Sequence, residues 1–415
     1  MLINEKTWEF VRQHANDDVR KLALQGAKDA EVDLQTALQQ IAGRQTARRK
    51  LPSWAEVEGV IYPPHLNMEQ CSSEQTARYK ATIVGEGERM VDLTGGFGVD
   101  FYWMSQGFRQ RTYVEQNEQL CAIAQENFRR LGRSCCVCCC DTATYLTEMP
   151  HVSLAFLDPA RRNEHGGRTY SIEDCTPNIL ELLPLLVQKA DRILFKLSPM
   201  LDWRKAVSDL ENASPNGVFK VAEVHIVSVD NECKELLLLL DKEQTDGLRV
   251  VCVNGASSFT FLPSVGMFSS QAGNNLFPVW EYLTDSDLAD SPLNLYEPNA
   301  SIMKAGYFAE LEAQFPVQQI SVNSHLFLSS DEINDFPGRK FKILSISSMN
   351  KQEIKKKFSE GLVPMESANI AVRNFPMSAE QLRKKLKLKD GGDTYIFATT
   401  LASGEHKLFF CRKIG

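Results

Sequence analysis

The sequence predicts an α/β protein built on a doubly wound parallel sheet, with helices before it and smaller α+β segments after it. From Met90 onward, short apolar runs alternate with longer, partly polar segments, as a succession of βα units requires. Two later runs, Lys220–Val229 and Cys233–Leu240, are separated only by Asp230-Asn-Glu232, which is too short for a helical crossover. These two runs therefore predict an antiparallel hairpin that closes the sheet.

The N-terminal region, by contrast, has the pattern of helices alone. Leu34, Leu38 and Ile41 recur at the spacing of one helix face. Ser53-Trp-Ala-Glu56 and Ser72-Ser-Glu-Gln75 have the spacing of capping boxes, in which a serine begins a helix. We therefore expect a helical domain before the sheet.

Five βα units precede the hairpin, and each apolar run is short enough for a strand covered on both faces. Five strands and a two-stranded hairpin make a seven-stranded sheet. This is the outline of the Rossmann-like methyltransferase fold rather than of a dinucleotide dehydrogenase. The five predicted strands are Met90–Leu93, Thr112–Glu115, Cys135–Cys140, Leu154–Leu157 and Ile193–Leu197.

The chain after the hairpin divides again. Arg249–Asn254 and Ser258–Leu262 predict one more hairpin, after which Pro, Asn, Gly and Ser become frequent up to about residue 275. The last segment alternates strand and helix patterns. The predicted domains are a helical domain over 1–80, a cofactor-binding α/β domain over 81–270, a small α+β domain over 276–335 and a basic domain over 339–415.

Composition excludes several classes of protein. With 415 residues, 43% hydrophobic and 24% charged, the chain is neither disordered nor fibrous. Its richest apolar stretch, Leu236–Leu240, is too short for a membrane span, and the N-terminus lacks the pattern of a signal peptide. Five of eleven cysteines fall within Cys135–Cys140, too close together for a disulfide framework, so a reducing cytoplasm is expected. Successive strand residues point to opposite faces, so these cysteines predict core packing and no metal site.

Charge is distributed unevenly along the chain. Arg339–Gly415 holds 16 Lys+Arg against 7 Asp+Glu, a net charge of +9, whereas the first 338 residues carry −16. A basic module on an acidic body is a footprint for nucleic acid, because phosphate neutralisation supplies most non-specific affinity. A solvated charged surface explains the same balance equally well.

The most informative segment is Val91-Asp-Leu-Thr-Gly-Gly-Phe-Gly-Val-Asp100, at the junction of the first strand and the following helix. Gly95, Gly96 and Gly98 let the backbone turn tightly and approach a ligand closely. Alone, these glycines are explained as well by a tight strand-to-helix connection. The spacing also differs from the G-x-G-x-x-G that places a pyrophosphate at a helix N-terminus.

Two acidic residues strengthen the interpretation of this loop as a cofactor site. Glu115 ends the second strand, where a carboxylate can accept both ribose hydroxyls of an adenosine. Asp141 closes the third strand, where the adenine edge would lie. We therefore expect S-adenosylmethionine rather than NAD, with Asp92 near its sulfonium and amino group and Thr94 as a further cofactor contact.

With these motifs the chain resembles a class I S-adenosylmethionine-dependent methyltransferase. More narrowly, it is similar to bacterial proteins that join this fold to a THUMP-like domain, a resemblance that implies ferredoxin-like and THUMP-like α+β domains and an RNA substrate. The motifs that carry it are Tyr62-Pro-Pro-His-Leu-Asn-Met-Glu-Gln-Cys-Ser-Ser-Glu-Gln-Thr-Ala-Arg-Tyr-Lys80, the glycine loop, Leu157-Asp-Pro-Ala-Arg-Arg162, Arg373-Asn-Phe-Pro and Gly391-Gly-Asp-Thr-Tyr395.

The fourth strand ends at the candidate reaction centre. In amine-methylating relatives the corresponding tetrad is Asp/Asn-Pro-Pro-aromatic, which holds an exocyclic amine and stacks on the base. Asp158 and Pro159 match this pattern and are the candidate catalytic residues, whereas Ala160 and Arg161 depart from it. Arg161 and Arg162 are candidate substrate contacts, by stacking on a base or binding a phosphate. Otherwise Asp158 only caps a helix and the arginines are surface cations.

The remaining candidate contacts lie further along the chain. Ser198 follows the fifth strand and is a candidate substrate contact or an ordinary turn residue before a proline. Lys384, Lys385 and Lys387 alternate with leucines, as in an amphipathic helix whose lysines either bind RNA or only face solvent.

The sequence therefore predicts a cytoplasmic S-adenosylmethionine-dependent methyltransferase that acts on a base in RNA, with no metal and no membrane partner. One alternative is a methyltransferase for a protein or a small molecule. Another is a non-catalytic RNA-binding protein that holds the cofactor without turnover.

Overall fold

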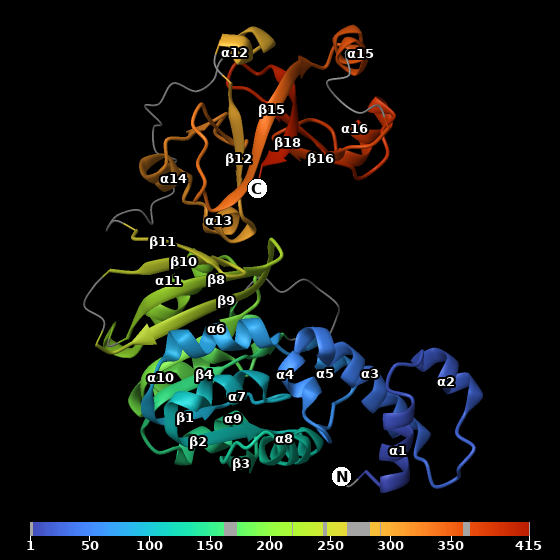
Figure 1. Cartoon of the computed structure of the whole chain (residues 1–415). Coiled ribbons are helices and arrows are strands. Elements are labelled where there is room, and N and C mark those ends of the chain that lie inside the picture. The colour runs from blue at the N-terminus through green and yellow to red at the C-terminus, as the bar shows by residue number, and fades with distance from the viewer. Residues whose placement is uncertain are drawn as a thin grey trace. The chain divides into compact units, whose positions relative to one another are not determined.

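The computed structural model describes residues 3–161, 172–217, 219–243, 247–263, 283–290, 292–359 and 366–414 (Figure 1). The chain divides into two compact units. One is made of Met1–His225 and Glu235–Leu248, and the other of Ile226–Lys234 and Arg249–Gly415. The bounds of the four domains that the sequence predicts remain predictions.

Helices alone occupy the described residues before the first strand, as the sequence predicted. Asn4, Asp18, Asp33 and Ser73 begin four of them, each side chain accepting a hydrogen bond from a backbone N–H of the first turn. The helices are α1 (Glu5–Gln13), α2 (Val19–Gln25), α3 (Leu34–Lys50), α4 (Pro52–Glu56), α5 (His65–Gln70) and α6 (Glu74–Val84).

Both predicted capping boxes are wrong in detail. Pro52 starts α4, so Ser53 lies inside the helix, where its backbone N and Oγ donate to Glu74 over 2.9 and 2.7 Å. The cap of α6 is Ser73 rather than Ser72. Ser72 instead places its hydroxyl in a buried polar network described below.

The segment around α4 and α5 is fixed to the sheet domain. Trp54 packs edge-on against Phe97 of the glycine loop, with ring centroids 5.2 Å apart. Asn127 of α8 (Glu118–Arg130) is fully buried and exchanges two 2.8 Å hydrogen bonds with the backbone of Ile61. These contacts explain why the helices and the sheet form one unit.

The first sheet has the strand order β11-β10-β8-β9-β7-β4-β1-β2-β3. The five strands from β7 to β3 pair in parallel, and β9 pairs antiparallel to β7, so the predicted methyltransferase sheet is confirmed. The hairpin β10–β11 extends it from seven strands to nine. The strands are β1 (Gly87–Asp92), β2 (Phe108–Glu115), β3 (Cys136–Cys139), β4 (Val152–Leu157), β7 (Ala190–Leu197), β8 (Lys220–Val229), β9 (Glu232–Asp241), β10 (Arg249–Asn254) and β11 (Ser257–Phe261).

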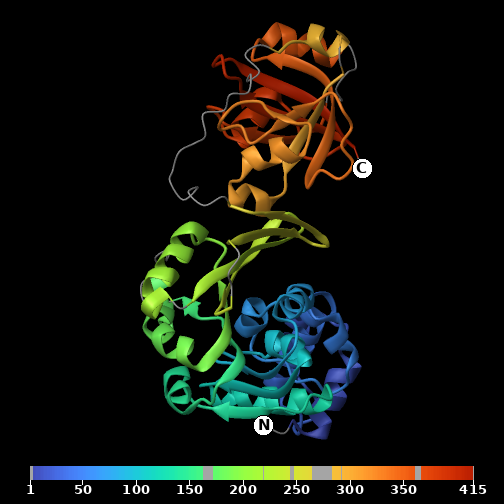
Figure 2. The same ribbon diagram turned by 90° about the vertical axis from the view of Figure 1, so that its left-hand side faces the viewer.

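Helices cover both faces of the parallel part of this sheet. The green helices α10 and α11 lie on one face and the blue-to-cyan helices on the other (Figure 2). Because the strand order reverses between β1 and β4, a crevice is expected outside their carboxyl ends. The remaining elements of this unit are α7 (Val99–Met104), α9 (Thr142–Glu148), α10 (Ile179–Lys189), α11 (Trp203–Ala213), the short pair β5 (Ala160–Arg161) and β6 (Cys175–Thr176), and three 3₁₀ turns at Ser105–Gly107, Ile172–Asp174 and Pro215–Gly217.

The second unit contains a seven-stranded sheet of order β13-β14-β12-β15-β18-β17-β16. Adjacent residues of β18, Phe409 and Phe410, enter two different apolar clusters, so both faces of the sheet are covered. Its elements are α12 (Asp285–Asp290), β12 (Asn294–Pro298), α13 (Ala300–Ala305), α14 (Phe308–Gln314), β13 (Gln318–Gln319), β14 (Phe327–Ser329), β15 (Gly338–Ser348), α15 (Lys351–Ser359), β16 (Asn369–Arg373), α16 (Ala379–Leu386), β17 (Thr394–Thr400) and β18 (His406–Ile414).

The expected burial of the cysteine run is wrong. Among the described strands, β3 is the last of its sheet and has no neighbour on its outer side. Cys136 and Cys139 are exposed, while the cysteines beside them are half-buried. Within the described ranges, no three metal-ligating side chains lie together. Nor does any helix of the described chain have the length and apolarity to cross a membrane.

Candidate functional site

The glycine loop after β1 is held against two aromatic rings. A Cβ atom on Gly95 would lie 2.1 Å from the Tyr113 ring, and one on Gly98, whose φ is 83°, would lie 2.6 Å from Phe128. Tyr113 Oη donates a 2.5 Å hydrogen bond to the carbonyl of Gly96. These glycines therefore allow the loop to pack closely on the two rings.

Glu115 closes β2 beside this loop. Its carboxylate accepts hydrogen bonds from the backbone N–H groups of Gly96, at 2.8 Å, and Asn117, at 2.9 Å. The side chain is half-buried and keeps further lone pairs for a ligand. The hydrogen bond from Gly96 thus holds Glu115, a predicted cofactor residue, next to the glycine loop.

Asp92, the last residue of β1, is almost completely buried. One of its oxygens accepts a 3.0 Å hydrogen bond from Thr94 N. Burial raises the pKa of this carboxyl well above its ordinary value, and the nearby carboxylates of Asp100, Asp158 and Glu115 add to the effect. A cation bound at this place would favour the charged form.

Thr94 connects the cofactor loop to the candidate reaction centre. Its hydroxyl accepts a 2.6 Å hydrogen bond from the backbone N–H of Asp158, which directly follows β4. Pro159 is buried, and the Asp158 side chain is 36% exposed. Thr94 therefore fixes the backbone from which the Asp158 carboxylate projects.

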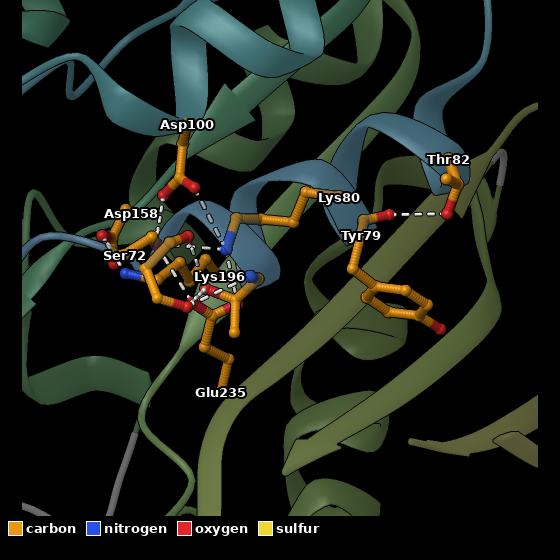
Figure 3. A network of polar contacts seen from close by, with 10 residues as sticks. Ser72, Tyr79, Lys80, Thr82, Asp100, Asp158, Lys196 and Glu235 are labelled. Atoms are coloured by element: carbon orange, nitrogen blue, oxygen red, sulfur yellow. Dashed lines mark hydrogen bonds and ion pairs between the residues drawn. The ribbon is translucent and has the colours of Figure 1, made fainter. Parts of the chain in front are cut away.

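Asp158 forms an ion pair with Lys196 from the end of the neighbouring strand β7 (Figure 3). Burial opposes the charge of Lys196, but the carboxylates of Asp158, Asp100 and Glu235 outweigh it and raise the pKa of the ammonium group. These carboxylates therefore favour the charged form of Lys196 next to the candidate acceptor residue.

A second ammonium group lies in the same network (Figure 3). Lys80 of α6 is completely buried, with Nζ 2.5 Å from Glu235 and 3.1 Å from both Asp100 and Ser72. The Ser72 hydroxyl lies 2.7 Å from an Asp100 oxygen and 3.0 Å from a Glu235 oxygen. The network connects α6, α7 and β9 with the carboxyl ends of β4 and β7.

Two predicted residues of this edge have local structural contacts. Asp141 begins α9 and accepts a 2.9 Å hydrogen bond from Thr144 N, while Cys140 N donates to the backbone carbonyl of Glu115 over 3.1 Å. Ser198 Oγ accepts a 3.2 Å hydrogen bond from Met200 N. Both residues follow strands of the same edge, so they stay candidate contacts.

The other predicted substrate contacts are not tested at this edge. The backbone of Arg161 pairs with Cys175 in the short β5–β6 pair, and Arg162 lies outside the described residues. Lys384, Lys385 and Lys387 belong to the other compact unit, on α16 and at its end, and all three are exposed.

Five residues of the network were not predicted as site residues: Ser72, Lys80, Asp100, Lys196 and Glu235. A signal was present, since a lysine beside apolar strand residues needs a partner. Lys196 interrupts Ile193–Leu197, and Glu235 immediately precedes Leu236–Leu240.

Comparisons with known proteins agree with this architecture. Residues 338–413 match a family model described as THUMP domain-like, and residues 295–337 match one described as a ferredoxin-like domain. The crystal structure of a candidate methyltransferase from Porphyromonas gingivalis W83 is 29% identical, covers 100% of both chains and superposes with a TM-score of 0.83. The resemblance to a methyltransferase with a THUMP-like domain is therefore confirmed.

More distant structures are similar only to part of the chain. A candidate class I S-adenosylmethionine-dependent methyltransferase from Listeria monocytogenes is 10% identical, covers 61% of this chain and 94% of its own, and has a TM-score of 0.38. TrmK of M. capricolum, solved with S-adenosylhomocysteine, is 12% identical over 41% of this chain and 68% of its own, with a TM-score of 0.30. These two likenesses are too weak to carry an argument. No curated protein matches the chain.

Proposed function

We propose that this protein is an S-adenosylmethionine-dependent methyltransferase that methylates a base in RNA. The observation that carries the proposal is the convergence of the glycine loop with Asp92, Glu115 and Asp158. Asp92 and Glu115 end the parallel strands β1 and β2, and the glycine loop and Asp158 follow β1 and β4, at the edge where α/β proteins bind ligands.

The charge of this site fits the proposed cofactor. Asp92, Asp100, Asp158 and Glu235 supply four carboxyl groups, against the ammonium groups of Lys80 and Lys196. A cofactor with a sulfonium and an ammonium group offsets this excess of acid, with Asp92 beside them. Glu115 would accept the ribose hydroxyls, and the loop of Gly95 and Gly96 would lie along the nucleoside. When bound, S-adenosylmethionine supplies an electrophilic methyl group.

The chain's own residues would then position the methyl acceptor. Asp158 would accept a hydrogen bond from the nucleophile, and the carbonyl of Pro159 would help to orient it. Thr94 holds the Asp158 backbone in place through its 2.6 Å hydrogen bond. In-line positioning of nucleophile and methyl group supplies most of the rate acceleration in such a reaction. Ser198, Arg161 and Arg162 are further proposed contacts of the substrate.

The proposal of RNA as substrate rests on the second unit. Its residues 338–413 match the THUMP domain-like family model. Leu382 and Leu386 bury the inner face of α16, while Lys384, Lys385 and Lys387 are exposed at its surface. Exposed lysines of this kind neutralise phosphates without reading sequence.

Glu115→Ala is expected to weaken S-adenosylmethionine binding about tenfold to a hundredfold, because charge-assisted hydrogen bonds to the ribose contribute about 1.5–3 kcal/mol. Isothermal titration calorimetry of the two proteins measures the change. Glu118→Ala is the matched control, since Glu118 is an exposed carboxylate in the first turn of α8. Unchanged affinity in the Glu115 variant would remove this residue from the cofactor site.

RNA affinity is expected to fall steeply with salt, with a log–log slope of roughly −0.7 per phosphate contacted on single strands. Replacing Lys384, Lys385 and Lys387 by Gln should make the slope shallower by about 2 and weaken binding to all RNA sequences, while S-adenosylmethionine affinity stays the same. Fluorescence anisotropy over a salt series tests both statements.

The control for this series is a triple Lys→Gln variant at lysines that are already ion-paired: Lys205, Lys220 and Lys234. It makes the same change in net charge and should keep the wild-type slope. Equal slopes in all three proteins would contradict the role of α16 in RNA binding and favour a protein or small-molecule substrate.

A further inference from the structure

The Asp158 carboxylate does not face the crevice alone. Lys196 forms an ion pair with it, and the two side chains are 36% and 12% exposed. The pair therefore presents a hydrogen-bond acceptor and a charged donor side by side to a substrate. Behind Lys196, the nearby carboxylates of Asp100 and Glu235 help to keep its positive charge.

This cation bears on the kind of nitrogen that can be methylated. An exocyclic amine becomes positively charged as it attacks a methyl group, so a neighbouring ammonium group raises its barrier. A ring nitrogen that first loses its hydrogen behaves in the opposite way. Its negative charge spreads onto the adjacent carbonyl oxygen, and a fixed cation at that oxygen stabilises it.

The segment after Asp158 points in the same direction. Asp158-Pro159 is followed by Ala160 and Arg161, so this short stretch contains no aromatic residue. Ala160 is exposed and supplies no ring for stacking. The Asp158–Lys196 pair therefore supplies the acceptor and the charged donor of this site, beside the proposed substrate contacts Ser198, Arg161 and Arg162.

We infer that the methyl acceptor is a ring N–H next to a carbonyl group, as at N3 of uracil or N1 of guanine, with Asp158 taking the proton and Lys196 facing the carbonyl oxygen. The inference rests on the proposed function and specifies the acceptor atom of the same site.

The step balances without a further reactant. The N–H proton passes to the Asp158 carboxylate, and the electron pair of the nitrogen forms a bond to the methyl carbon as the carbon–sulfur bond breaks. The pair of that bond returns to sulfur, which becomes a neutral thioether. Asp158 then releases its proton to solvent through its exposed edge.

The acceptor atom is identified by mass spectrometry of nucleosides. Total RNA from a strain lacking the gene is incubated with the full-length protein and S-adenosylmethionine carrying a deuterated methyl group. Labelled N3-methyluridine or N1-methylguanosine is the expected product. Label on an exocyclic amine, on another ring nitrogen, on a carbon or on a ribose would overturn the inference and leave the methyltransferase proposal intact. No labelled nucleoside would overturn both.

Variants of Lys196 test its part in the step. Lys196→Met should lower kcat about a hundredfold, as expected when a donor to developing negative charge is lost, with KM for RNA and cofactor affinity little changed. Lys196→Arg keeps the positive charge and should retain at least a tenth of the wild-type kcat. A tenfold loss corresponds to about 1.4 kcal/mol in the activation free energy. Lys205→Met, which removes a lysine from an ion pair on the surface of α11, is the control. An unchanged kcat in Lys196→Met, or equal losses in the Met and Arg variants, would contradict the proposed role of the cation.

Discussion

Asp158→Ala is expected to lower methyl transfer to RNA by about a hundredfold to ten-thousandfold, the usual contribution of a positioned acid or base. Affinity for S-adenosylmethionine should change by no more than about threefold, or ~0.7 kcal/mol, because Asp158 is proposed to contact the acceptor rather than the cofactor. Single-turnover rates with labelled cofactor and calorimetric titrations measure these two quantities.

The ion pair with Lys196 requires a control for stability. Removing the Asp158 carboxylate leaves the largely buried ammonium group of Lys196 without this partner. The nearby carboxylates of Asp100 and Glu235 still offset part of the resulting loss of stability. Asp158→Asn keeps the shape of the side chain and should lose activity to a similar extent. Asp209→Ala removes the carboxylate of a surface ion pair with Lys205 and should leave activity unchanged.

These measurements separate the possible roles of Asp158 and test whether the protein is an enzyme. Loss of methyl transfer with intact cofactor binding supports Asp158 as the acceptor residue. Loss of both indicates that it is a cofactor ligand or a structural residue. Wild-type methyl transfer in Asp158→Ala would contradict its catalytic role, and a wild-type protein that binds cofactor and RNA without turnover would favour the non-catalytic alternative.

The sequence predicted the parts of the site that depend on local pattern. The glycine loop, Asp92 and Glu115 each lie at the end of an apolar run, so a strand assignment is enough to bring them to one edge. Asp158 follows a strand in the same way, and its backbone hydrogen bond to Thr94 confirms that the two loops meet.

The sequence indicated that Lys196 needs a partner, but which residues meet in the polar network could not be predicted, because this depends on strand order. Lys196 meets Asp158 only because β7 lies next to β4, and β9 brings Glu235 there by running antiparallel beside β7. The exposure of Cys136 likewise depends on β3 being an edge strand. Such neighbours are far apart in the chain, and no periodicity of the sequence encodes them.

The largest expected effect on stability is at Lys80, which is completely buried and contacts two carboxylates. Lys80→Met keeps most of the aliphatic volume but leaves Asp100 and Glu235 charged, close together and without this counter-ion. Breaking a buried ion pair in this way costs about 3–5 kcal/mol, because the desolvated charge of the partner is no longer compensated.

Urea unfolding followed by tryptophan fluorescence measures this cost, since four of the five tryptophans, Trp8, Trp54, Trp103 and Trp203, lie in the first unit. Lys220→Met, whose ammonium is exposed and 4.0 Å from Glu211, should change stability by less than about 0.5 kcal/mol. Adding Glu235→Gln to Lys80→Met removes one of the uncompensated charges and should recover part of the loss. A loss below about 1 kcal/mol in Lys80→Met would mean that water or a change of protonation compensates the carboxylates, and the network would then contribute little to folding.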